Sequence, residues 1–473
     1  GAKIPSKQRM TGVRFAPQWR AEFRATQQLA LPLILTNLSL TLIGATDVVM
    51  IGWLGAKELA AASLGSSLIM ATVIFCMGLI TATAPMMASE RGRKAHSVRD
   101  LRRTFRQGLW VSVAISSLVW LVLWQTAPIL RLLGQNEELA SLAGTYVRAC
   151  MWSILPYLWV LLIRNFLSVM ERPGWSLMVG MAGVIVNAGC NYALMFGGFG
   201  LPAMGLVGAG IGSVLANLFM LLAMMAILRM HPRFRRYSLF GRWWRSDWAR
   251  FRTLWKFGVP IGVAIALEDA IFIAAVIMMG WFGPNTLAAH AIALQIGSIA
   301  FMVPLGLAQA ATVRIGIGFG RQDHGLIKRA GWTAFFLTIA FMVGMALLIA
   351  TQRDLLVSLF MSPGHPANSE IAELAVSFLG IAALIQVADG VQVVCTGMLR
   401  GLHDTRWPMI FAVTGYSVVG VGIGAWLAFA RGWEGLGIWV GLGSGISVVA
   451  LLVLGRWLLR YRLGLLSHAP VRS

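Results

Sequence analysis

The stretch Gly-Trp-Leu-Gly-Ala-Lys-Glu-Leu-Ala-Ala at residues 52–61 returns later in the chain as Gly-Trp-Phe-Gly-Pro-Asn-Thr-Leu-Ala-Ala at residues 280–289. The two copies lie 228 residues apart, and Pro32 and Pro260, further upstream, keep the same spacing. Self-similarity at a fixed offset is typical of a chain built from repeated copies of one unit. We therefore predict two structurally similar halves.

Composition indicates that these halves lie in a membrane. Hydrophobic residues make up 58% of the 473 residues and charged residues only 12%, which leaves too little polar surface for a water-soluble globule. A helix needs about 20 apolar residues to cross a bilayer core. Runs of that length predict twelve spans, at residues 27–53, 59–89, 109–129, 146–170, 175–196, 204–228, 254–281, 287–318, 332–350, 371–399, 409–430 and 436–459.

Six spans in each half mean that both copies enter the membrane in the same direction. The predicted fold class is therefore an all-α membrane protein whose twelve transmembrane helices form two six-helix lobes related by a parallel pseudo-twofold repeat. The predicted domains are a cytoplasmic N-terminal segment (1–26), an N-lobe (27–228), a basic cytoplasmic linker (229–253), a C-lobe (254–461) and a cytoplasmic tail (462–473). The Arg, Trp and Phe residues of the linker predict a segment that lies on the cytoplasmic leaflet.

The net charge of +21 would suit a nucleic-acid-binding protein, but the placement of the basic residues argues against that class. Basic residues gather in every second loop and are sparse in the loops between. The gathered set is Arg91, Arg93, Lys94, Arg99, Arg102, Arg103, Arg106, the run at 229–256, Arg321, Lys328, Arg329, Arg400, Arg406, Arg456, Arg460 and Arg462. Because positive loops stay in the cytoplasm, both termini are predicted to be cytoplasmic in a multi-pass protein of the cell inner membrane. Anionic lipid headgroups are the expected partners of these loops.

Nearly all of the eighteen acidic residues lie in predicted loops or near the ends of predicted spans; the exceptions are Asp47, Glu268, Asp269 and Asp389. A charge in the bilayer core costs at least ~2.5 to 3.5 kcal/mol on insertion scales, so such acids face a cavity, find a partner or are protonated. Asp389 has Gln386 and Gln392 three residues before and after it, which predicts one polar helix face. Asp269 lies about 100° around the helix from Glu268, so the two side chains are not expected to point at the same spot.

In the first half, Asn187 and Asn191 are four residues apart and share a helix face, which makes them candidate partners for Asp47. Asn can ligate Na⁺ through its carbonyl oxygen or hydrogen-bond a carboxyl group. Polar contacts that only hold helices together are the alternative for this cluster. Arg164 is interpreted as the lone base within a span, expected to snorkel to the cytoplasmic end or to pair with an acid there.

Four segments at these residues resemble the multidrug and toxic compound extrusion family, and within it the NorM-type branch. They are Ala-Thr-Asp-Val-Val-Met-Ile-Gly (45–52), Val-Pro-Ile-Gly-Val-Ala-Ile-Ala-Leu-Glu-Asp (259–269), Leu-Ala-Ala-His-Ala-Ile-Ala (287–293) and Asp-Gly-Val-Gln-Val-Val-Cys-Thr-Gly-Met-Leu-Arg-Gly-Leu-His-Asp-Thr (389–405). The resemblance implies cation coupling at Glu268 and Asp389, which become candidate Na⁺ ligands, and a first-lobe cluster at Asp47, Asn187 and Asn191. Some relatives have Asp at the position of Asn191, and some have an aromatic residue at the position of Ile385.

The implied activity is secondary multidrug efflux, in which extracellular Na⁺ or H⁺ is exchanged for hydrophobic organic cations by alternating access of two lobes. A monomer is expected, with small organic cations, a monovalent cation and lipid as partners and without nucleic acid. A lipid-linked precursor flippase of the same architecture is the alternative, although it would favour a cavity lined with Arg and Lys.

An intramembrane enzyme is disfavoured, because the sequence has no phosphate-binding loop and no His-Glu-x-x-His motif. No cofactor is expected apart from the coupling ion. Cys76, Cys150, Cys190 and Cys395 lie in apolar spans and are expected to be small hydrophobic residues, not disulfide or zinc ligands.

Overall fold

The computed structural model describes residues 15–93, 95–242, 244–245, 247–360 and 368–466. Part of the predicted N-terminal segment (1–14), Lys94 and the end of the predicted tail (467–473) lie outside these residues. Within the described ranges the chain is helical, and twelve helices are long and apolar enough to cross a membrane. The predicted fold class is confirmed.

The six spans of the first half are α1 (Phe15–Gly52), α2 (Ala56–Thr81) continued by α3 (Thr83–Arg93), α4 (Ser97–Leu123), α6 (Glu137–Cys150) continued by η1 (Met151–Ser153) and α7 (Ile154–Val169), α8 (Gly174–Phe196) and α9 (Leu206–Met230). Short elements connect them: α5 (Thr126–Leu132), η2 (Gly198–Gly200) and α10 (Pro232–Arg235). The third predicted span, 109–129, ran too far, because α4 ends at Leu123 and the chain turns before α5 begins.

The second half contains α11 (Trp248–Trp281), α12 (Pro284–Arg321), α13 (His324–Thr351), α15 (Ser369–Gly401), the composite eleventh span and α18 (Gly435–Leu458), with the short α14 (Arg353–Ser358) after α13. The eleventh span runs through α16 (Arg406–Ala412), η4 (Val413–Val421), α17 (Gly422–Ala425) and η5 (Trp426–Ala430), where η4 and η5 are π-helical. Glycines let this wider helix lie against α18, since Gly424 and Gly441 face each other at backbone contact.

The repeat read from the sequence has a direct structural counterpart. Ala56 begins α2 and Pro284 begins α12, at the same 228-residue offset, and Pro32 and Pro260 lie inside α1 and α11. The residues before the two helix starts, Gly55 and Gly283, have φ of 141° and 113°. An L side chain is strained at such angles, which explains why both copies keep glycine at the turn between their first two helices.

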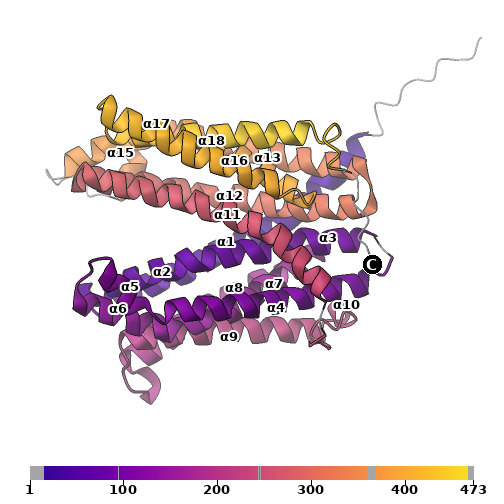
Figure 1. Cartoon of the computed structure of the whole chain (residues 1–473), viewed down its shortest axis with the longest axis horizontal. Helices are drawn as coiled ribbons and strands as arrows, with labels where there is room; N and C mark the ends of the chain where they lie inside the picture. The colour runs from indigo at the N-terminus through magenta and orange to yellow at the C-terminus, as the bar shows by residue number, and fades with distance from the viewer. Residues whose placement is uncertain (1–14, 94, 243, 246, 361–367, 467–473) are drawn as a thin grey trace, which may run out of the picture.

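The two halves meet at one end of the molecule and diverge toward the other (Figure 1). We call the meeting end the basic end, because the Arg-rich loops after α3, between α9 and α11, and after α12 lie there. Helix pairs α2–α11, α3–α12 and α1–α12 join the halves. Gly78 on α2 opposes Gly262 on α11, and Gly320 on α12 lies against the Ser89 carbonyl on α3, with no room for a Cβ atom at these contacts.

The linker does not simply lie on a leaflet, as the sequence had suggested. Phe234, Tyr237 and Leu239 are buried, and Phe234 and Tyr237 pack edge-on against Phe166 of α7. Phe240 packs in the same way against Phe105 of α4. The aromatic residues that suggested a membrane-surface segment are therefore part of the core of the first lobe, although Trp244 and Trp248 are well exposed.

Candidate functional site

A cavity of about 320 Å³ lies inside the second lobe, between α11, α12, α15 and α18. Three of the four acids predicted from the sequence line it: Glu268 and Asp269 from α11 and Asp389 from α15. Gln386, one turn before Asp389, lines it as well. All three carboxylates are half-buried, so the cavity gathers negative charge in a place of limited hydration.

The arrangement differs from the expected one in two details. Glu268 and Asp269 both line the cavity, although their directions on an ideal helix differ by about 100°; a cavity of this width spans both directions. Gln392 is buried but is not among the cavity-lining residues, so the predicted polar face of α15 continues past the cavity into the helix packing. The Oε1 atoms of Gln386 and Gln392 are buried without a hydrogen-bond partner in the described structure.

Aromatic side chains form much of the cavity wall. Phe272 comes from α11, Phe301 from α12 and Trp439 from α18, and Ile385 of α15 also faces the cavity. These three aromatic residues could not be selected from the sequence, because aromatic side chains are common in its apolar spans. Aromatic faces beside carboxylates suit an organic cation, since a ring face attracts positive charge and the carboxylates balance it. The structure thus supplies aromatic residues even though Ile385 is aliphatic.

The first lobe contains a smaller polar cluster around Asp47 of α1. Asn187 and Asn191 of α8 donate hydrogen bonds from Nδ2 to the same Asp47 oxygen, Oδ1, at 2.8 and 2.7 Å. Both asparagines are fully buried, and their Oδ1 atoms have no hydrogen-bond partner among the described residues. The helix-face argument therefore selected three side chains that the fold brings into contact.

Arg164 does not snorkel, and it pairs with no acid among the residues that the structure describes, so that interpretation of it was wrong. It is 7% exposed, and its Nη2 donates to Oδ1 of Asn37 at 2.8 Å. Asn37 in turn donates from Nδ2 to Oε1 of Gln309 on α12, at 3.3 Å. Asn37 and Gln309 lie in different halves of the chain, so these hydrogen bonds link the two lobes.

Nor is Arg164 the lone base within a span, because Arg314 lies in α12. The Arg314 guanidinium donates to both oxygens of Glu22 on α1, at 3.0 and 2.7 Å, and to Glu171 after α7, at 2.8 Å. Glu22 is 3% exposed. The sequence interpretation missed this cluster because Glu22 fell in the predicted N-terminal segment, whereas α1 begins at Phe15.

A second ionic cluster ties the start of α11 to the first lobe. Arg250 forms ion pairs with Glu90 of α3 at 2.5 Å, with Asp100 of α4 at 3.2 Å and with Asp247 at 3.3 Å. Glu90 is 5% exposed, although it lies just beyond the end of the predicted span 59–89. The Arg250 and Arg314 clusters thus both place ionic contacts between the lobes at the basic end.

The motif at 389–405 runs from the cavity to the basic end. Its last acid, Asp404, lies in the turn between α15 and α16 and pairs with Arg456 of α18. Burial raises the pKa of Asp404, and the Arg456 guanidinium acts in the opposite direction. This part of the motif thus holds the ends of three helices together and is not in contact with the cavity.

Comparison with known proteins fits this geometry. The sequence profile of the MatE family matches residues 32–193 and 260–426, one segment in each lobe. The chain belongs to this family, the multidrug and toxic compound extrusion transporters, and is a transporter, not an enzyme. It is 50% identical over 445 residues to a probable multidrug resistance protein NorM of Mesorhizobium japonicum, covering 94% of this chain and 95% of that protein.

A probable multidrug resistance protein NorM of Brucella suis is 46% identical over 442 residues, which cover 93% of this chain and 94% of the relative. Among solved structures, a Vibrio cholerae MATE transporter superposes with a TM-score of 0.84 at 18% identity, covering 95% of this chain and 99% of that one. At that identity the likeness concerns the fold, which is the two-lobe arrangement described above.

Proposed function

We propose that this protein is a secondary active multidrug exporter that exchanges Na⁺ or H⁺ for hydrophobic organic cations by alternating access of its two lobes. The observation that carries the proposal is the second-lobe cavity, where α11 and α15 bring Glu268 and Asp389 together between aromatic walls. The names of the NorM relatives support drugs as the substrate class.

The cavity suits a small organic cation in size and in chemistry. Ligand sites typically enclose about 300–1,000 Å³ and combine apolar walls with a few polar groups. Here Phe272, Phe301 and Trp439 offer ring faces, and Met302 offers a side chain that adapts its shape readily. Because the bound cation is then recognised by its charge and not by directional hydrogen bonds, one cavity can accept chemically different cations.

Competition for the carboxylates would make exchange obligatory. An unpaired carboxylate is costly to enclose away from water, and a bound Na⁺, a proton or a drug cation removes that cost. Only a neutralised cavity is then able to close and reopen on the other side, because each ligand stabilises the occluded arrangement relative to the bare charge. Glu268 and Asp389 are the groups we assign to this exchange, and Asp269 adds a further negative charge to the cavity lining.

Asp47 is the second candidate position for the coupling ion. Its carboxylate and the amide oxygens of Asn187 and Asn191 are of the oxygen type that Na⁺ takes as ligands. This cluster is in the other lobe from the cavity. An ion bound there would act on exchange through the packing of α1, which contacts both lobes.

Alternating access requires that the contacts at the basic end break. In the conformation described here, the halves meet at that end through Arg314, Arg250 and the glycine contacts, and they diverge toward the other end (Figure 1). With the basic loops in the cytoplasm, this arrangement corresponds to a transporter that faces outward. The opposite state would open the basic end and bring α2 and α11 together at the other.

A flippase for lipid-linked pyrophosphates fits this cavity less well. Such a substrate carries negative charge, and the lining residues of the second-lobe cavity include three acids and no Lys or Arg. The charge of the cavity thus favours cationic cargo.

The direct experiment measures ethidium efflux from proteoliposomes with a Na⁺ gradient alone and with a pH gradient alone. We expect one or both gradients to drive efflux, and we expect Asp389→Asn and Glu268→Gln each to abolish it while the protein still inserts. Asp354→Asn, which removes an exposed acid on α14, is the matched control and should transport normally. Normal efflux by both cavity variants would refute the site assignment.

A further inference from the structure

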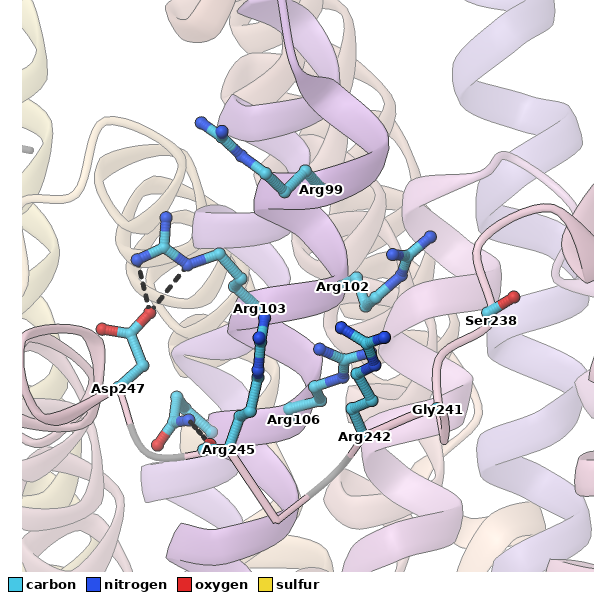
Figure 2. Close-up of a pocket in the computed structure, with 10 residues that line it drawn as sticks. Arg99, Arg102, Arg103, Arg106, Ser238, Gly241, Arg242, Arg245 and Asp247 are labelled. Carbon is cyan, nitrogen blue, oxygen red and sulfur yellow. Dashed lines mark hydrogen bonds and ion pairs between the residues drawn. The ribbon is translucent and has the colours of Figure 1, made fainter.

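A second, larger cavity of about 790 Å³ lies at the basic end, between the start of α4 and the segment that joins the two lobes. Its walls carry six arginines (Figure 2): Arg99, Arg102, Arg103, Arg106, Arg242 and Arg245. Asp247 is the one acid among its lining residues. This Arg pocket is separate from the acidic cavity, and the exchange described above makes no use of it.

The single acid is already engaged. Arg103 donates to Asp247 from Nε at 2.9 Å and pairs with it through Nη2 at 2.8 Å, and Arg250 pairs with the same oxygen at 3.3 Å. Arg102 donates to the Tyr237 carbonyl oxygen at 2.5 Å. Arg99 pairs with Asp100 at 3.7 Å. Within the part of the chain that the structure describes, this leaves Arg106, Arg242 and Arg245 facing the pocket without a carboxylate partner.

Arg106 is the most buried of these three arginines. It is 9% exposed, and its Nε is buried with no hydrogen-bond partner among the described residues. The positive charges of Arg102, Arg242 and Arg245 repel the Arg106 guanidinium. Figure 2 shows the Arg106 and Arg242 side chains at the centre of the pocket. Gathering like charges around a buried guanidinium is unfavourable unless an anion joins them.

The pocket is held open by rigid neighbours. Phe234, Tyr237 and Phe240 anchor the joining segment in the core of the first lobe. Ser238 and Arg242 then adopt left-handed backbone angles, φ 43° and 52°, which are strained for residues with side chains. The segment therefore turns Arg242 toward α4 at some conformational cost, as expected of a site and not of a solvated loop.

The position of the pocket indicates what fills it. Arg106 lies on α4 just before the apolar stretch that begins at Leu109, which is the depth where a helix passes from headgroups into acyl chains. Trp244 and Trp248, which are next in sequence to the lining residues Arg245 and Asp247, are 66% and 63% exposed, and exposed Trp is typical of the membrane interface. A phosphate group at this depth belongs to a phospholipid of the leaflet at the basic end.

We infer that the Arg pocket binds the headgroup of an anionic phospholipid, and that its size and charge favour a headgroup with two phosphodiesters over one with a single phosphate. Guanidinium groups bind phosphate oxygens through paired, charge-assisted hydrogen bonds. The bound lipid would bridge α4 of the first lobe and the segment that leads into α11 of the second. This inference does not depend on the substrate or the coupling ion.

The test measures lipid retained by the purified full-length protein after delipidation, with native mass spectrometry and melting temperature as readouts. Diphosphatidylglycerol, phosphatidylglycerol and phosphatidylcholine are added in turn, and inorganic pyrophosphate serves as the soluble phosphate probe. We expect diphosphatidylglycerol to bind best and to raise the melting temperature, phosphatidylglycerol to bind less well, and pyrophosphate to bind at least tenfold more weakly than the lipid.

The double variant Arg106→Gln with Arg242→Gln should bind diphosphatidylglycerol at least about tenfold more weakly. The control is Arg233→Gln with Arg235→Gln, which removes the same charge from exposed positions of α10 outside the pocket. Arg242→Gln alone removes an exposed side chain and keeps the test valid if the double variant folds poorly. Equal lipid binding by the pocket and control variants would overturn the inference, and so would tight binding of pyrophosphate that displaces the lipid.

Discussion

Replacing Arg314 with Gln is expected to release the two lobes at the basic end. The guanidinium holds both oxygens of Glu22 and also reaches Glu171, from helix α12 to α1 and to the turn after α7. Because Glu22 is 3% exposed, the variant leaves a buried carboxylate without its counter-charge. Removing one partner of a buried pair costs about 3–5 kcal/mol, whereas the contact with the partly exposed Glu171 contributes about 1 kcal/mol or less.

This cost falls on the conformation in which the lobes meet at the basic end. If separation of the lobes gives Glu22 access to water, the opposite conformation avoids most of this free-energy cost. A difference of about 3 kcal/mol changes an equilibrium constant by about 150-fold, enough to make a minor conformation the major one.

Double electron–electron resonance would measure the shift. Spin labels at Leu133 and Leu359 report the separation of the lobes at the end away from the basic loops, after the four native cysteines are replaced by alanine. Both positions are exposed, one after α5 and the other after α14. In Arg314→Gln we expect the shorter-distance population to grow at the expense of the longer one.

Arg456→Gln provides the matched control, because it removes an Arg–carboxylate pair at the same end but within one lobe. Its distance distribution should match that of the unmodified protein. An unchanged distance distribution in Arg314→Gln, or the same change in both variants, would refute a role of Arg314 in holding the lobes together.

Three further predictions follow from the packing and the sites. Gly320→Val should lower the free energy of unfolding by about 1–3 kcal/mol or more, since its side chain would overlap the Ser89 carbonyl oxygen; Gly455→Val, which has open space around it, should change the thermal unfolding in detergent far less. Trp439→Ala should weaken binding of tetraphenylphosphonium by about 2- to 30-fold, the range of cation–π energies of about 0.5–2 kcal/mol, and unchanged affinity in equilibrium dialysis would exclude Trp439 from the drug site. Asp47→Asn should slow ion-driven ethidium efflux while leaving tetraphenylphosphonium binding intact, because Asp47 lies in the other lobe; lost binding with normal coupling would contradict this.

The sequence predicted most of the fold because its main signals are local. Apolar runs mark helices that lipid surrounds, and the offset between the two copies survives in the structure at Ala56 and Pro284. Helix ends were less predictable, since charged residues at the basic end look like loops in a hydropathy profile. Glu22 and Glu90 were missed for this reason: each continues a helix and is buried against an arginine from a distant part of the chain.

The acidic residues of the candidate site could be selected because a carboxylate in an apolar span needs a reason to be there. Their aromatic neighbours could not, because Phe301 and Trp439 look like ordinary membrane-helix residues until α12 and α18 are packed against α15. Gln392 shows the limit of helix-face reasoning, since the spacing placed it with Asp389 but not at the cavity. The Arg pocket could not be predicted from the sequence, because Arg106 and Arg242 line one pocket only once the linker has folded.

In the proposed exchange, a drug cation and the coupling ion compete for the carboxylates Glu268 and Asp389. Isothermal titration of the purified protein with tetraphenylphosphonium tests this competition most directly, at low and high Na⁺ and at neutral and acidic pH. We expect Na⁺ or protons to raise the apparent Kd of the unmodified protein, and we expect Asp389→Asn to bind the drug weakly and without dependence on either ion. Tight drug binding by Asp389→Asn and Glu268→Gln, with the same ion dependence as the unmodified protein, would contradict competition at these carboxylates.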